Sequence, residues 1–240
     1  MQENIYKLYI SEAGRRKMTY QLILSGVDGM VIASDQKELL SPRSSEEGEG
    51  YKPNMVTKIR ISPSGEFAWA FAGKTLSAIT SGYFERALEG SPTDSPTEID
   101  RILRDCCDRA WKENATGPDN ESTIVLADGP NRRILRARLS PMTIVEPISG
   151  GRCFAGQSFN AASFIARRFY SPQMSVAELA LIASYAVREA HEADSVCVDG
   201  LDLVVYKDST GRFDFADSGD YWLRAAELHS KMQAVIKLAA

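Results

Sequence analysis

Residues 19–35 have the sequence TYQLILSGVDGMVIASD, in which two apolar runs stand on either side of a short turn. Gly26 and Gly29 flank Val27-Asp28, and glycines at such positions favour the tight connection between two paired strands. The stretch therefore predicts a β-hairpin whose strands run antiparallel.

A second strand pair is predicted downstream, over residues 57–63 and 66–73. The run from Phe67 to Gly73 is apolar throughout, which suits a strand covered on both faces. Between the two strand pairs, residues 37–55 are polar, rich in Ser, Gly and Glu, and without periodicity. They therefore predict a surface loop.

The remaining chain alternates between helical and strand patterns. Apolar residues at helical spacing predict helices, and short apolar runs predict strands. Ser175 and Glu178 have the spacing of a capping box at the start of one helix. Helices are expected over residues 75–88, 96–111, 161–170, 175–190 and 221–238, and strands over residues 122–128, 132–140, 142–149, 201–208 and 212–217.

The predicted order of elements is strands, two helices, strands, two helices, strands and a final helix. This order fits neither a regular alternation of strand and helix nor an all-β sandwich. It fits an α+β fold, a four-layer αββα sandwich in which two antiparallel sheets lie between helical layers. One domain of this kind accommodates the 240 residues.

The composition argues against several classes of protein. The chain is 44% hydrophobic and 25% charged, as a globular protein is, and its formal charge of −4 argues against a nonspecific nucleic-acid binder. No apolar run approaches the roughly eighteen residues that cross a bilayer, and residues 1–17 lack the apolar core of a signal peptide. We therefore expect a cytoplasmic protein with no nucleic acid and no membrane as its partner.

The cysteines and histidines do not predict a metal site. The four cysteines lack CxxC spacing, only two histidines could join them as ligands, and neither histidine stands near a nucleophile elbow. We expect no metal and no cofactor, mostly buried thiols, and no Ser-His-Asp triad. The residues concerned are Cys106, Cys107, Cys153, Cys197, His191 and His229.

From Thr19 onward the sequence resembles the opening of proteasome β-type subunits and of related bacterial peptidase rings. That opening has a threonine, an apolar strand, an Asp-Gly turn and a second strand ending in Ala-x-Asp, matched here by Asp28-Gly29 and Ala33-Ser34-Asp35. The simpler bacterial rings compare best, including the ancestral β-subunit type with its Met-Thr-Tyr start. The resemblance continues through Lys58-Ile59, Phe71-Ala72-Gly73, residues 154–180 and residues 193–208.

The resemblance implies the fold of an N-terminal-nucleophile hydrolase and a threonine-type endopeptidase with Thr19 as its nucleophile. An N-terminal threonine has a base in its own α-amine, whose unperturbed pKa is about 7.7–8. Lys58 would lie beside Thr19 and lower the pKa of the nucleophile and of its amine, and Asp35 would hold the lysine in place. The backbone amide of Gly73 would donate to the oxyanion.

Three further positions match helper residues of the family. Asp194 matches the aspartate of an Asp-Ser-x-Ser segment, in which Cys197 replaces the second serine. The family's Gly-Ser-Gly before its third helix is replaced by residues 156–158, which leaves Ser158 as the nearest hydroxyl. Both departures concern helpers rather than the Thr, Asp and Lys core.

The resemblance also implies a substrate class and partners. Phe71 falls where the family sets the floor of its specificity pocket, which implies a shallow apolar pocket and cleavage after apolar residues. Subunits of this kind assemble into homo-oligomeric rings that enclose their active sites and take in unfolded protein or peptides. Such rings usually work with an ATP-dependent unfoldase, which is therefore a possible partner here.

Residues 1–18 precede the matched hydrolase domain, residues 19–240, and are expected to be a leader, a propeptide or a mis-called extension. The family usually has glycine before its threonine, whereas Met18 stands here. Translation from Met18 and removal of that methionine would expose Thr19 directly. Autolysis of a longer leader is the other route.

Two other functions remain open at the level of sequence. A noncatalytic scaffold subunit with the same fold is suggested by Gln157, by Cys197 and by the segment before Thr19. An amidase of the same superfamily, acting on a small molecule, would use the same N-terminal threonine. An α-type subunit fits less well, because its gating helix is not visible in this sequence.

Overall fold

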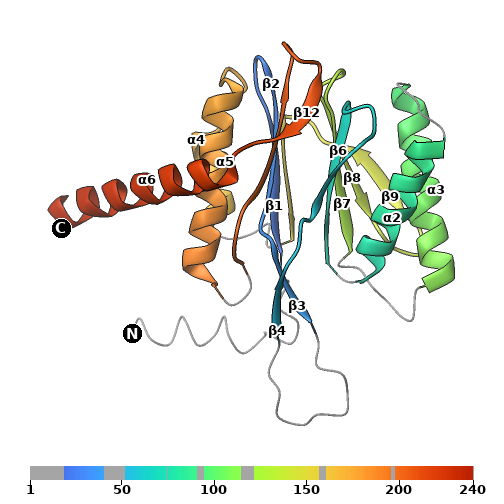
Figure 1. The fold of residues 1–240 in the computed structure, drawn as a ribbon, viewed down its shortest axis with the longest axis horizontal. Coiled ribbons are helices and arrows are strands. Elements are labelled where there is room, and N and C mark those ends of the chain that lie inside the picture. Colours follow the sequence, from blue (N-terminus) through green and yellow to red (C-terminus); the bar gives the residue numbers. More distant parts are fainter. Residues whose placement is uncertain are drawn as a thin grey trace, which may run out of the picture.

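The computed structural model describes residues 19–40, 52–73, 75–90, 95–114, 122–156, 161–195 and 198–239. Two five-stranded sheets lie face to face, and helices cover the outer face of each (Figure 1). The described part of the chain is an α+β, four-layer αββα sandwich of two antiparallel sheets, which confirms the predicted fold class.

The first sheet contains the predicted hairpin. Its strand order is β10-β1-β2-β11-β12, and every pair of neighbours runs antiparallel. The N–H of Gly26 donates to the carbonyl of Gly29 at 2.9 Å and closes the turn of the hairpin. The strands are β1 (Tyr20–Ser25), β2 (Gly29–Ser34), β10 (Arg152–Gly156), β11 (Asp202–Lys207) and β12 (Arg212–Phe215).

The second sheet follows chain order from edge to edge. Its strand order is β5-β6-β7-β8-β9, again antiparallel throughout. The short strand β5 lies at one edge and pairs only with β6. The strands are β5 (Ile59–Ile61), β6 (Phe67–Ala72), β7 (Thr123–Asp128), β8 (Arg133–Arg138) and β9 (Ile144–Pro147).

The alternation of side chains along β6 explains how the layers pack. Phe67 and Trp69 point to the helices that cover the second sheet, whereas Ala68 and Ala70 point to the first sheet. Large rings therefore fill the helical interface, and small methyl groups allow the two sheets to approach. The same division makes β6 apolar on both faces, as the sequence predicts.

Five described helices complete the outer layers. Helices α2 and α3 pack on the second sheet, α4 and α5 pack on the first, and α6 packs against α5 before extending away from the body (Figure 1). Ser175 and Glu178 form the predicted capping box at the start of α5. The helices are α2 (Thr75–Gly90), α3 (Pro96–Asn114), α4 (Ala161–Phe169), α5 (Val176–Ala193) and α6 (Ser218–Ala239).

The structure differs from the sequence prediction at three places. Residues 37–55 were expected to form a loop, yet they include a two-stranded ribbon of β3 (Lys37–Leu40) and β4 (Lys52–Met55). The sequence of residues 37–55 is polar overall and without periodicity, so it contains no pattern that predicts a strand. Strand β10 is additional to the predicted strands, and α6 begins at Ser218 rather than at residue 221.

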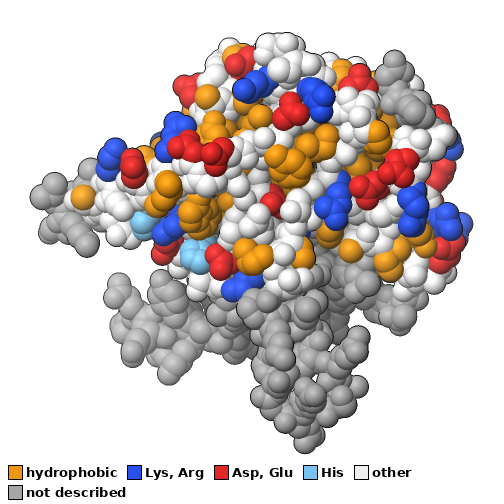
Figure 2. All heavy atoms as spheres, viewed as in Figure 1, with side chains coloured by type: hydrophobic (Ala, Val, Ile, Leu, Met, Phe, Trp, Pro, Cys, Tyr) orange, Lys and Arg blue, Asp and Glu red, His pale blue; other side chains and the backbone are white. Residues whose placement is uncertain are grey.

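The surface carries charges of both signs, and the described cysteines are buried, as the composition predicts. On the face shown in Figure 2, Lys and Arg side chains are interspersed with Asp and Glu. Cys106, Cys107 and Cys153 are buried and free, and Cys197 lies outside the described residues. Within the described segments, no helix is both long and apolar enough to cross a bilayer.

Candidate active site

Thr19 lies directly before β1 and is buried, with 7% of its surface exposed. The register places Gly156, the last residue of β10, opposite Tyr20. Gly156 has a φ of +72°, and a Cβ built on it would lie 1.9 Å from the carbonyl oxygen of Thr19. Only a glycine allows this approach, so Gly156 determines how closely β10 packs on Thr19.

Asp35 follows β2 and its carboxylate is fully buried. The carboxylate accepts hydrogen bonds from the backbone N–H of Tyr20 at 2.7 Å and of Lys37 at 3.1 Å. The N–H of Asp35 in turn donates to the carbonyl of Tyr20 at 3.1 Å. The hairpin predicted from the sequence therefore brings Asp35 back to the residue that follows Thr19.

Lys58 reaches the same place from the second sheet, directly before β5, and is 4% exposed. Its Nζ donates to Oδ2 of Asp35 at 2.7 Å, to the carbonyl oxygen of Lys37 at 2.5 Å and to Oγ1 of Thr19 at 3.3 Å. Three acceptors use the three N–H bonds of the ammonium group. The structure thus brings Thr19, Asp35 and Lys58 together, the three residues that the resemblance groups, and their catalytic roles stay predictions.

The electrostatics of this cluster are dominated by burial. Loss of water raises the pKa of Asp35 from 3.8 to about 6, although the positive charge of Lys58 and the backbone donors of Tyr20 and Lys37 lower it. The ionised carboxylate is the form that pairs with Lys58. The ion pair therefore weakens as the pH falls through about 6.

Asp202, the first residue of β11, is a functional candidate that the sequence analysis did not single out. Its Oδ2 accepts the backbone N–H of Lys58 at 2.9 Å, and its Oδ1 accepts Nε2 of Gln36 at 2.7 Å. Burial raises the pKa of this carboxyl, while Gln36 and Lys58 lower it. An aspartate directly before the apolar run Leu203–Tyr206 was the available signal, because buried charges are rare unless paired.

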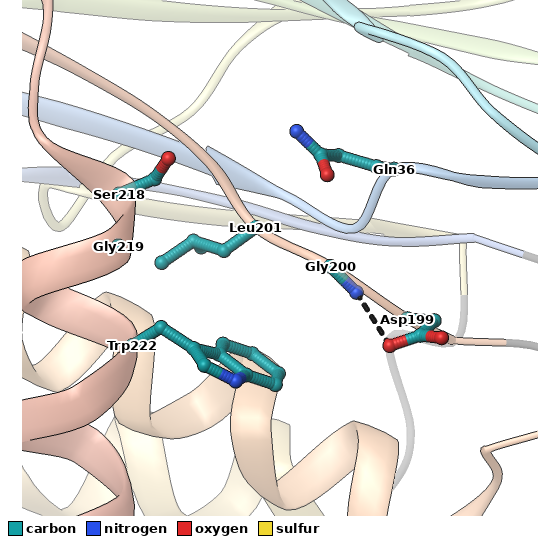
Figure 3. A pocket seen from close by; sticks show the side chains of 7 residues that line it. All are labelled: Gln36, Asp199, Gly200, Leu201, Ser218, Gly219 and Trp222. Atoms are coloured by element: carbon teal, nitrogen blue, oxygen red, sulfur yellow. Dashed lines mark hydrogen bonds between the residues drawn. The ribbon is translucent and has the colours of Figure 1, made fainter.

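Gln36 also lines a shallow cavity of about 210 Å³ near the N-terminus of α6 (Figure 3). Its side chain extends into this space from the segment after Asp35, opposite the indole ring of Trp222. The remaining lining residues are Asp199, Gly200, Leu201, Ser218 and Gly219.

Gln21, on β1, forms a second connection between the sheets that the sequence analysis did not foresee. Its Nε2 donates to the carbonyl oxygen of Phe71 at 2.7 Å, and the residue is fully buried. Oε1 of the same amide has no hydrogen-bond partner among the described residues. The strand that follows Thr19 is thereby tied to the end of β6, two residues before Gly73.

Gly73 and Phe71 lie at the end of β6. Gly73 has a φ of +108°, a conformation that favours glycine, and it is exposed. Phe71 is half-buried, and its ring packs on the hydrophobic cluster under α2 and α3. The oxyanion role of Gly73 and the pocket role of Phe71 stay predictions.

The predicted helper residues are placed only in part. Asp194 caps the C-terminus of α5: its N–H donates to the carbonyl of Ala190 at 3.0 Å, and its own carbonyl accepts the N–H of Val198 at 2.9 Å. Ser158 and Cys197 lie outside the described residues. The helper roles of all three residues therefore stay predictions, as does the division of the chain at residue 18, which is also outside the described segments.

Both histidines occupy the contact between α5 and α6. Nδ1 of His191 lies 2.9 Å from the carbonyl oxygen of Val198, and its ring meets Trp222 edge-on. Nδ1 of His229 lies 2.5 Å from Oε1 of Glu189. Within the described segments, no three His, Cys, Asp or Glu side chains gather as a metal site.

Solved structures of Anbu have a similar fold. One comes from Yersinia bercovieri and is described as an ancestral beta-subunit, with a TM-score of 0.69. Two come from Hyphomicrobium sp. strain MC1, one of them a Gly-1 mutant, each with a TM-score of 0.68. All three are 15% identical to this chain, and each match covers 91% of it. The match covers 96% of the Gly-1 mutant, 97% of the other Hyphomicrobium protein and 96% of the Yersinia protein.

The comparisons correct the expected family. No protein-family model and no curated protein matches the sequence. The structural neighbours are Anbu proteins, which are proteasome-like but form a family distinct from the proteasome β-type subunits, so the assignment to that family was wrong. An identity of 15% shows the shared fold alone.

We predict that Gly156→Ala displaces Thr19. An alanine at a positive φ costs about 1–2 kcal/mol, and the clash of its Cβ with the Thr19 carbonyl adds about 1–3 kcal/mol. The free energy of unfolding, measured in urea, checks the sum. Gly150→Ala is the matched control, because Gly150 has a φ of +82° but open space around its Cβ position. Equal losses in the two variants would contradict the close approach to Thr19.

We also predict a strong coupling between Asp35 and Lys58. Lys58→Met leaves a buried carboxylate without its cation, which costs about 3–5 kcal/mol of unfolding free energy at pH 8. Adding Asp35→Asn restores part of this loss, because the neutral amide removes the buried charge and its one oxygen still accepts one of the two backbone N–H groups. A double-mutant cycle at one protein concentration measures the coupling. Additive losses would mean that the two charges do not interact.

Proposed function

We propose that this chain is a threonine-type peptidase subunit of a self-compartmentalising, proteasome-like assembly, with Thr19 as its nucleophile. The observation that carries the proposal is the buried chain of contacts from Asp35 to Nζ of Lys58 at 2.7 Å and from Nζ to Oγ1 of Thr19 at 3.3 Å. A hydroxyl beside a buried, paired ammonium group is stabilised as it loses its proton.

The mechanism requires that Thr19 be the first residue of the mature chain. Its α-amine is then free to take the proton of the hydroxyl, directly or through one water, from within the same residue. Because Met18 precedes Thr19, initiation there followed by removal of the methionine would be the shortest route. Cleavage of residues 1–18 would have the same result.

The first half of the reaction forms an ester. Oγ1 of Thr19 attacks the carbonyl carbon of the scissile peptide bond, and the α-amine takes the hydroxyl proton. The N–H of Gly73 is proposed to donate to the oxyanion that develops on the carbonyl oxygen. When the C–N bond of the substrate breaks, the α-ammonium group of Thr19 returns the proton to the leaving amine.

The second half hydrolyses the ester with a water molecule. The water oxygen attacks the acyl carbon while the α-amine takes a proton from the water. The proton then passes to Oγ1 of Thr19 as the bond between Oγ1 and the acyl carbon breaks. Lys58 keeps its charge in both halves, because its role is to stabilise the deprotonated threonine oxygen. Asp35 keeps the ammonium group of Lys58 in position.

Assembly and substrate belong to the same proposal. The shared fold with the Anbu ancestral beta-subunit supports self-association into a proteasome-like ring, in which the sites would face an enclosed chamber. Unfolded proteins or peptides would be the substrates, an ATP-dependent unfoldase a possible partner, and the cytoplasm the location. A half-buried Phe71 would favour cleavage after apolar residues.

The decisive experiment combines intact mass with a covalent probe. We expect the protein expressed from its native gene to begin at Thr19, and we expect an epoxyketone, which reacts with both the hydroxyl and the amine of an N-terminal threonine, to add one molecule per subunit. Thr19→Ala should abolish the adduct and peptide hydrolysis while the protein stays folded. A mature chain that begins at Met1 or Met18, or one without an adduct, would favour a noncatalytic scaffold.

The pH profile offers a separate prediction. Below the pKa of the α-amine, its protonation lowers kcat/KM about tenfold per pH unit. Below about pH 6, protonation of Asp35 lowers kcat/KM by a further factor of about ten per pH unit. The slope of log kcat/KM against pH should therefore steepen from one to two near pH 6.

The effect of Asp35 protonation on folding stability distinguishes this loss of kcat/KM from a loss caused by unfolding. The pKa of Asp35 is higher in the folded protein, about 6, than its ordinary value of 3.8, so the folded state binds more protons between these values. This carboxyl therefore makes folding more favourable as the pH falls through 6. Circular dichroism should stay native where the slope steepens, and a slope of one down to pH 4.5 would contradict the role of Asp35.

A further inference from the structure

Lys58 is held at both ends by carboxylates of the opposite sheet. Asp35 holds its Nζ at 2.7 Å, and Oδ2 of Asp202 accepts its backbone N–H at 2.9 Å. The two carboxylates come from neighbouring strands, because the register pairs Asp202 with Ser34, the residue before Asp35. Both ends of one lysine are thus attached to the sheet that also carries Thr19.

The strand that follows Lys58 supplies little of this support. Strand β5 is three residues long, stands at the edge of the second sheet and begins only at Ile59. Its partner β6 pairs with Ile59 and the residues after it. The position of the Lys58 backbone therefore depends on the hydrogen bond that crosses from Asp202.

Asp202 is itself firmly held. It is 5% exposed, and Nε2 of Gln36 donates to its Oδ1 at 2.7 Å, which leaves Oδ2 oriented toward Lys58. The backbone of Gln36 is anchored in turn, since its N–H donates to the carbonyl of Asp199 at 2.8 Å and its carbonyl accepts the N–H of Val56 at 2.8 Å. The carboxylate thus has one defined orientation between the two sheets.

We propose that Asp202 is a positioning residue that sets the distance from Nζ of Lys58 to Oγ1 of Thr19 by fixing the lysine backbone. This proposal rests on the proposed function of Thr19. A lysine side chain has four rotatable bonds, so its ammonium group is located only when its backbone and its Nζ are both restrained. Without Asp202, the contact of 3.3 Å to Thr19 would lose one of its two restraints.

The test compares two substitutions at the same position. Asp202→Ala removes the acceptor, and a misplacement of about 1 Å at the lysine lowers kcat about 100-fold while KM stays within about twofold. Asp202→Asn keeps an acceptor oxygen for the Lys58 N–H, with Gln36 turning its amide to match, and keeps kcat within about fivefold. Rescue by asparagine would separate a hydrogen-bonding role from a need for the second negative charge.

A matched control separates positioning from a general effect on the sheet. Asp214→Ala removes an exposed carboxylate from β12 of the same sheet, where its partner is Arg212 at 3.2 Å, and should leave kcat and KM unchanged. Comparable losses of kcat in Asp202→Ala and Asp202→Asn, or a loss that appears in KM alone, would overturn the positioning role.

Two measurements without catalysis keep this inference distinct from the proposed function. Hydrogen exchange of the Lys58 amide should accelerate at least about tenfold in Asp202→Ala and stay near the wild-type rate in Asp202→Asn. A crystal structure of Asp202→Ala should show Nζ of Lys58 moved away from Oγ1 of Thr19. If the wild type were inert toward peptides and the probe, the proposed function would fail, whereas an unchanged lysine in Asp202→Ala would overturn the positioning role itself.

Discussion

The buried ion pair between Lys58 and Asp35 is the interaction on which the candidate site depends. A charge placed between two sheets is costly unless an opposite charge and hydrogen bonds accompany it. Here a carboxylate lies 2.7 Å from Nζ and accepts two backbone N–H groups besides. Because Lys58 belongs to one sheet and Asp35 to the other, the pair also sets how the two sheets meet at Thr19.

Several polar contacts between the sheets lie around this pair. Asp202 reaches the backbone of Lys58, and Gln21 reaches the carbonyl of Phe71 at the end of β6. Farther along the strands, the space between the sheets is filled by small and branched apolar side chains, including Ala68 and Ala70. Apolar packing fixes the spacing of the layers but not their register, whereas directional hydrogen bonds fix both. At the other end of the sandwich, Arg132 donates to the carbonyl of Gly26 at 3.1 Å, so polar contacts tie the sheets at both ends.

The comparisons place the fold among Anbu structures without extending to activity. Two proteins at 15% identity share the arrangement of strands and helices because many sequences satisfy the same layer packing. Activity depends on single side chains, and in this chain Gln157 and Cys197 depart from the residues expected of a threonine peptidase. The proposed chemistry therefore depends on the contacts of Thr19, Lys58 and Asp35.

By itself, the sequence determined most of the secondary structure and the αββα layering. Apolar periodicity and glycine-flanked turns are local signals, and the hairpin from Tyr20 to Ser34 returns Asp35 to Thr19 by strand pairing alone. The family resemblance implied the place of Lys58 beside Thr19, although the family it indicated was wrong.

Only the tertiary structure revealed the ribbon of β3 and β4, strand β10 and the roles of Asp202 and Gln21. Strand β10 has an apolar run of only three residues, and it pairs with β1, more than 120 residues earlier in the chain. Asp202 is 144 residues from Lys58 in the chain, and Gln21 is 50 residues from Phe71. Contacts at such separations arise only when the two sheets are stacked, so no local signal could have predicted which polar residue meets which backbone group.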